Sequence, residues 1–124
     1  MADLHFPPRE LAVMSVLWRR GPSTVTEVRE GLDDDLAYTT VLSALQTLEE
    51  KGYVTHEAVG RAYRYAATVP ADRAGRSALA RIKEAIFHGS SEAMLTQMFS
   101  DRKLSRAELE RMRALLDQRL KEGK

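Results

Sequence analysis

Small hydrogen-bonding side chains recur along one face of a helix predicted over about residues 38–51. Threonine, serine and glutamine suit hydrogen bonds to DNA base edges, and a leucine on the same face suits contact with a thymine methyl. Solvated helix faces usually carry Lys, Glu and Arg instead, so this composition favours close approach to a groove. The candidate side chains for such contacts are Tyr38, Thr39, Thr40, Leu42, Ser43, Gln46, Thr47 and Lys51.

Two arginines follow this helix in a predicted two-stranded ribbon over residues 53–66, which turns at a glycine. Strand alternation places Tyr63 and Tyr65 on one face of the ribbon and Arg64 on the other. Arg61 and Arg64 are candidates for contact with phosphate or the minor groove, although edge-strand arginines also serve solubility. A helix followed at once by an arginine-bearing hairpin is typical of winged helix-turn-helix DNA binding.

Two earlier helices are expected to position this face. Apolar spacing predicts the first over about Pro8 to Arg20, and a capping box at Thr24 and Glu27 opens the second. In the helix over 38–51, an apolar stripe at i, i+3, i+4 and i+7 should face the core. That stripe is Val41, Ala44, Leu45 and Leu48. The aromatic side chains expected to pack in the core are Trp18, Tyr63 and Tyr65.

Beyond residue 68 the chain is predicted to be helical, over about 71–88, after a cap at Ser91, and after a capping box at Ser105 and Glu108. Three amphipathic helices of this size bury little surface alone, so we expect them to pair with a second copy. The candidate dimerisation residues are Leu79, Ile82, Ile86, Met94, Leu95, Met98, Phe99, Leu109, Met112, Leu115, Leu116 and Leu120.

The predicted fold class is mainly α with a small β-hairpin. A winged helix-turn-helix domain over residues 1–68 precedes a three-helix dimerisation region over residues 69–124. No membrane span or signal design is present, so we expect a cytoplasmic protein. With no cysteine, three isolated histidines and no catalytic motif, the sequence predicts no metal site, no cofactor and no enzyme. The Asp33-Asp34-Asp35 run lacks the spacing of a calcium loop and is expected to be a solvated turn.

The net charge of the predicted DNA-binding domain does not favour a general electrostatic attraction to DNA. Residues 1–67 hold seven Lys or Arg against ten Asp or Glu, which gives a net charge of −3. Residues 68–124 hold twelve against eight, a net charge of +4. Because phosphate binding normally uses a basic face, any DNA contact must depend on locally placed arginines and backbone amides.

Several motifs in order resemble the penicillinase and methicillin-resistance repressor family, the BlaI/MecI/CopY group. Residues 10–18, Glu-Leu-Ala-Val-Met-Ser-Val-Leu-Trp, resemble its E-x-x-[IV]-M-x-x-[IVL]-W opening. Residues 37–52 look like its recognition helix and residues 60–65 like its wing. The resemblance implies a homodimeric repressor of a palindromic operator, controlling β-lactam-resistance or related stress genes. It places DNA contacts at Thr39, Thr40, Ser43 and Thr47, with Arg61 in the wing.

Two departures concern induction. The resemblance makes a sensor protease a potential partner, but Gln97-Met98 stands where the cleaved members have Asn-Phe. The copper-responsive members use Cys-x-Cys motifs, and this chain has no cysteine. Two alternatives stay open. One is a winged-helix protein-interaction module that has lost DNA binding, and the other is a small-molecule sensor with a pocket at the helical dimer interface.

Overall fold

The computed structural model describes residues 4–123. The elements run in the order α1 (Pro8–Arg20), β1 (Ser23–Thr24), α2 (Val25–Gly31), α3 (Tyr38–Glu50), β2 (Val54–Val59), β3 (Ala62–Ala67), α4 (Ala71–Ala85), α5 (Ser91–Phe99) and α6 (Arg106–Lys121). The chain divides into two compact units, residues 1–80 and 81–124. The division falls inside α4, and the functional boundary expected after residue 68 stays a prediction.

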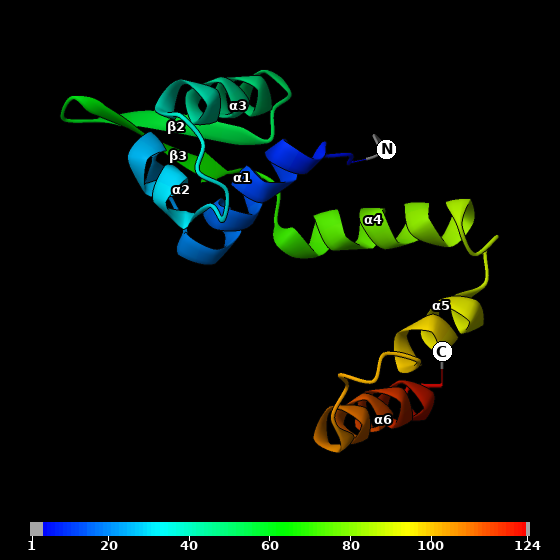
Figure 1. Ribbon diagram of the computed structural model, residues 1–124. Coiled ribbons are helices and arrows are strands. Elements are labelled where there is room, and N and C mark those ends of the chain that lie inside the picture. Colours follow the sequence, from blue (N-terminus) through cyan, green and yellow to red (C-terminus); the bar gives the residue numbers. More distant parts are fainter. Residues whose placement is uncertain (1–3, 124) are drawn as a thin grey trace. The chain divides into compact units, whose positions relative to one another are not determined.

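The first unit is a winged-helix arrangement in which α1, α2 and α3 pack together against a small sheet (Figure 1). The sheet is antiparallel in the order β1-β3-β2, and the hairpin of β2 and β3 projects beyond the helices. Gly60 opens its two-residue turn with φ of 62°, a left-handed conformation that glycine adopts without strain. The fold class predicted from the sequence is confirmed.

The core lies where the apolar faces of the three helices meet the sheet. Its members include the whole predicted stripe of α3, namely Val41, Ala44, Leu45 and Leu48. Tyr65 is 2% exposed, and Trp18 is half-buried with its indole N–H donating to the Val69 carbonyl at 2.8 Å. This hydrogen bond ties the segment that leads into α4 to the first helix.

Short sequence motifs correctly predicted where most of the helices begin or end. The predicted bounds of α1 are those observed, and both capping boxes are present, at Thr24 with Glu27 and at Ser105 with Glu108. Two predictions need correction. Ser90, not Ser91, accepts the capping hydrogen bond at the start of α5, and α4 ends at Ala85.

The chain leaves α4 through His88 and Gly89, which both have positive φ. The Gly89 N–H donates to the Lys83 carbonyl at 2.9 Å, which closes the end of the helix. The strand β1 is not predicted by the sequence pattern, since two residues carry no periodic signal. Its register, Ser23 opposite Tyr65 and Thr24 opposite Arg64, depends on the approach of β3.

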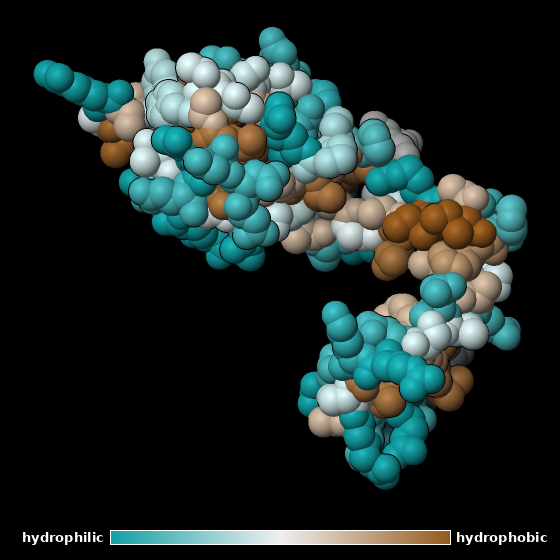
Figure 2. Space-filling model, viewed as in Figure 1, coloured by the Kyte–Doolittle hydropathy of each residue, from teal (hydrophilic) through white to brown (hydrophobic). Residues whose placement is uncertain are grey.

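The described residues of the second unit, 81–123, form no buried core. None of the described residues after position 80 is buried, although three amphipathic helices or parts of them lie there. Figure 2 shows hydrophobic side chains gathered at the surface over the C-terminal half of α4. Exposed fractions reach 63% at Ile86, 68% at Leu120 and 72% at Leu115. These helices therefore present apolar faces that the single chain does not cover.

Candidate nucleic-acid interface

The exposed face of α3 is set by the burial of the opposite face. Because Val41 and Leu48 are fully buried, helix geometry turns Thr39, Ser43 and Gln46 to the outside, and all three are exposed. Thr40 and Thr47 are half-buried along one edge of this face. The polar side chains predicted for this face therefore lie together on a single helix surface, flanked by other parts of the first unit.

Leu42 does not lie on the exposed face of α3, where the sequence pattern placed it. It is half-buried and packs against the hydrophobic core instead of lying freely on the outer face. Tyr38, at the beginning of the helix, is 47% exposed. Contact of Leu42 with a thymine methyl stays a prediction, but packing already accounts for an apolar residue at this position.

The beginning of α1 borders the edge of the α3 face that carries Thr40 and Thr47. A cleft of about 450 Å³ separates the two helices and is lined by Arg9, Glu10, Thr39, Thr40, Ser43, Ala44 and Thr47. At one end, the Lys51 ammonium donates to the Glu10 carboxylate at 2.8 Å. The charge of Lys51, a predicted DNA contact, is therefore already matched within the domain.

The hairpin border carries a histidine and two tyrosines. Nδ1 of His56 lies 2.7 Å from both carboxylate oxygens of Glu49, which joins β2 to the last turn of α3. The His56 ring also contacts Tyr63 and Tyr65, with centroid separations of 4.6 and 5.4 Å. Burial raises the pKa of the Tyr65 hydroxyl, and the nearby Glu49 carboxylate adds to the shift.

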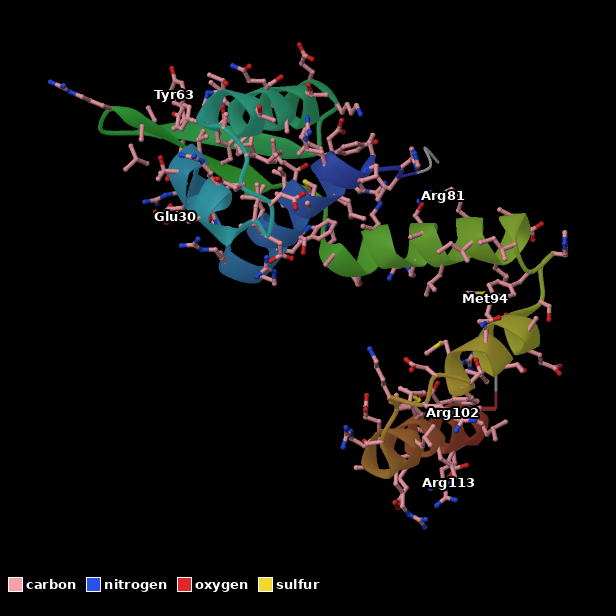
Figure 3. The ribbon with its side chains drawn as sticks, viewed as in Figure 1. Glu30, Tyr63, Arg81, Met94, Arg102 and Arg113 are labelled. Carbon is pink, nitrogen blue, oxygen red and sulfur yellow. The ribbon has the colours of Figure 1, made fainter. Side chains whose placement is uncertain are left out.

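The prediction that Tyr63 packs in the core is wrong. Its side chain is 54% exposed, on the α3 side of the hairpin, and does not belong to the core (Figure 3). Tyr63 lies closer to the end of the hairpin than Tyr65, past the point where α3 covers the sheet. Strand alternation predicted the shared face correctly, but the depth of each residue depended on how far the helix extends.

The two hairpin arginines occupy different surroundings. Arg61 is exposed at the turn, next to Gly60, as predicted. Arg64 is also exposed, but it lies opposite Thr24 on β1 and Glu57 on β2. The pKa of the Glu27 carboxyl is lowered, first by the Thr24 backbone N–H and also by the positive charges of Arg20 and Arg64. The positive charge of Arg64 is therefore partly offset by carboxylates of its own domain.

Sequence reasoning missed the contribution of α1 to this surface. Arg9 and Glu10 line the cleft beside α3, whereas the sequence pattern assigns both only to a helix that supports the fold. The signal that could have revealed this was an arginine in the first turn of a helix, in a domain with few cations. Within the described part of the chain no cluster of side chains could hold a metal ion, and no helix is long and apolar enough to cross a membrane.

Comparison with known proteins agrees with this arrangement. The family model for the penicillinase repressor matches residues 7–118. Two proteins named transcriptional regulator BlaI, from the CDC 1551 and H37Rv strains of Mycobacterium tuberculosis, are each 50% identical to this chain over 60 residues. Those matches span 46% of this chain and 44% of each relative, which is less than half the length of either protein.

Solved structures support the fold. The transcriptional regulator Tm0710 from Thermotoga maritima matches with a TM-score of 0.54 and 20% identity, over 90% of this chain and 72% of that one. A MarR family protein from Bacillus stearothermophilus matches with a TM-score of 0.51 and 20% identity, over 82% and 74% of the two chains. The family model covers nearly the whole chain, and the chain therefore belongs to the penicillinase repressor family, a family of transcriptional regulators and not of enzymes.

Proposed function

We propose that this protein is a sequence-specific DNA-binding repressor that acts as a homodimer on a palindromic operator. The observation that carries the proposal is the exposed face of α3, where Thr39, Ser43 and Gln46 lie free of the core. A helix of this kind fits the major groove, where hydroxyl and amide groups hydrogen-bond to base edges. Membership of a family of transcriptional regulators supports the same conclusion.

The remaining predicted contacts take positions around this face. Tyr38, Thr40, Thr47 and the half-buried Leu42 lie along its edges, and Arg61 extends the surface along the hairpin. In the proposal Arg61 binds phosphate or the minor groove. Arg64 contributes less, because Glu57 and Glu27 lie beside it. Lys51 contributes through its ion pair with Glu10, which fixes the end of α3 against α1.

The helical region is proposed to form the dimer. Every candidate dimerisation residue is exposed or half-buried in the single chain, and no described residue beyond position 80 is buried. Apolar side chains exposed by 40% at Leu109 and 55% at Leu116 are costly in water, and a second copy offers a matching face. A two-fold dimer would then place two α3 helices on half-sites about 34–36 Å apart, or a multiple of that distance.

A sensor protease is not part of the proposal. Gln97 and Met98 lie in α5, at the position that the family resemblance assigns to the cleaved Asn-Phe bond. The proposed site of action is the cytoplasm, where a regulator meets chromosomal DNA.

Selection from genomic DNA tests the proposal. The purified 124-residue chain is mixed with duplex fragments of its source genome at two salt concentrations, and the retained fragments are sequenced. We expect enrichment of one palindrome, with affinity that falls as salt rises because phosphate contacts release counterions. Flat enrichment at both salt concentrations would overturn the proposal and favour the protein-interaction alternative.

A further inference from the structure

Arg9 lies at the edge of the proposed DNA-reading face without a partner among the described residues. It is the second residue of α1, its side chain is exposed, and it lines the same cleft as Thr40, Ser43 and Thr47 of α3. Within residues 4–123 no hydrogen bond or ion pair engages its guanidinium. The local fold therefore does not explain why a cation stands at this place.

The other basic side chains of the first 67 residues show how unusual this is. Arg19 and Arg20 donate to the carbonyls of Gly31 and Glu27, and Arg29 donates to the Leu36 carbonyl and lies 3.8 Å from Asp35. Lys51 is paired with Glu10, and Arg64 lies near Glu27. Of these seven cations, Arg9, Arg61 and Arg64 form neither a hydrogen bond nor an ion pair within the described residues. Arg64 lies opposite Glu57 in the sheet and near Glu27, which leaves Arg9 and Arg61 as the two cations without a carboxylate partner.

These two arginines flank the exposed face of α3. On the α1 edge, Thr40 and Thr47 lie two helical turns apart beside Arg9. On the opposite edge, Glu49 contacts His56 of the hairpin, whose turn carries Arg61. A duplex whose major groove receives α3 has one sugar-phosphate backbone on each side of that helix. The unpaired cations lie at the borders where those backbones pass.

The acidic groups near Arg9 do not neutralise it. The neighbouring Glu10 carboxylate accepts from Lys51, and its side chain is only 15% exposed. Arg9 also borders a second cleft, toward the turn between α2 and α3, where Asp33 and Asp34 lie in the lining. It forms no ion pair with either aspartate. The guanidinium is therefore available to a ligand that approaches the α3 face.

We infer that Arg9 is a DNA-binding residue that contacts a backbone phosphate on the α1 side of the recognition helix, and so complements Arg61 on the hairpin side. The inference rests on the proposed function and deepens it. A planar guanidinium with paired N–H donors matches a phosphate well, and such a contact positions the helix without reading sequence. Two placed cations would also explain how a domain of net charge −3 binds a polyanion at all.

The test compares full-length variants by titration with a duplex of about 30 base pairs, enough for two half-sites one helical turn apart. A mixed arbitrary sequence serves, since phosphate contacts are sequence-independent. Binding is measured over a series of salt concentrations for the wild type, Arg9→Ala and Arg9→Lys. The matched control is Arg102→Ala, which removes the same charge from the loop between α5 and α6, outside the first unit.

We expect Arg9→Ala to weaken binding roughly tenfold at low salt. The slope of log affinity against log salt should fall in magnitude by about 0.9 for each phosphate that the protein no longer neutralises. Arg9→Lys should restore most of the slope, and Arg102→Ala should match the wild type. Thermal melting should be unchanged for every variant, because within residues 4–123 Arg9 forms no hydrogen bond or ion pair on which the fold depends.

Failure of the inference is distinguishable from failure of the proposed function. If the wild type shows no salt-dependent binding to duplex, the proposed function is wrong. If the wild type binds and Arg9→Ala keeps the wild-type affinity and slope, the inference about Arg9 is overturned while the function stands. Weaker binding with an unchanged slope would also overturn it, because a protein that neutralises fewer phosphates must release fewer counterions.

Discussion

The Lys51 ammonium and the Glu10 carboxylate, 41 residues apart in the chain, form an ion pair of 2.8 Å that joins the end of α3 to the first turn of α1. The pair fixes one end of the recognition helix relative to the helix that carries Arg9. It also means that a lysine expected to contact DNA has a structural role.

Breaking this ion pair should cost little stability, because the Lys51 side chain is 40% exposed. We expect Glu10→Gln and Lys51→Met each to lower the free energy of unfolding by about 0.5 kcal/mol, the range of solvent-screened pairs. A double-mutant cycle by urea denaturation measures the coupling. Strictly additive effects of the two substitutions would show that the contact contributes nothing.

The hairpin turn supplies the second prediction. Replacing Arg61 with Ala should weaken binding to all duplex sequences and lower the salt slope by about one unit for each protomer, since its proposed partner is a phosphate. Arg64→Ala removes the same side chain from the same hairpin and is the matched comparison. It should change the slope less, because the carboxylates of Glu57 and Glu27 lie near Arg64. An Arg61→Ala protein with wild-type affinity and slope would remove the hairpin turn from the interface.

Two glycines in the first unit should respond to alanine in opposite directions. A Cβ on Gly31 would lie 2.8 Å from Cγ1 of Val16, which is 1% exposed and cannot easily move. Gly31→Ala should therefore lower stability by about 1–3 kcal/mol through overpacking. Gly75 in α4 has open space around it, and Gly75→Ala should raise stability by about 0.5–1 kcal/mol. Chemical denaturation of both proteins checks the signs, and equal shifts would contradict the packing argument.

Acid should weaken the start of α2 through Glu27. The Thr24 backbone N–H, followed by the Thr24 hydroxyl and the charges of Arg20 and Arg64, lowers the pKa of this carboxyl in the folded protein. A lowered folded-state pKa gives stability that is present above the ordinary carboxyl range and is lost as pH falls through the folded value. In Glu27→Gln this part of the acid sensitivity should disappear. An NMR titration giving Glu27 an ordinary pKa would contradict the prediction.

The proposed dimer predicts the effect of a charge on α6. Leu116 is 55% exposed in the single chain, so Leu116→Glu should leave the first unit folded. In the dimer the carboxylate would be buried, so we expect a monomer in sedimentation equilibrium and a large loss of operator affinity. Gln118→Glu adds the same charge to an exposed site on the same helix and should stay dimeric. A dimeric Leu116→Glu protein would place the interface elsewhere.

Short-range patterns in the sequence determined the bounds of several helices and the buried face of α3. Apolar spacing predicted the bounds of α1, two capping boxes placed the starts of α2 and α6, and the buried stripe of α3 followed from its period. Each of these features depends on residues within about four positions of each other, which is why a linear reading finds them.

Tertiary structure alone decided what surrounds the α3 face. The pairing of β1 with β3, the half-burial of Leu42, the exposure of Tyr63 and the place of Arg9 beside the threonines all depend on how distant elements pack. The sequence also did not determine which cations lack an ion pair, because Lys51 contacts Glu10 only once α1 and α3 have packed together. Periodicity fixes which side of a helix is buried, but only packing fixes what stands at its edges.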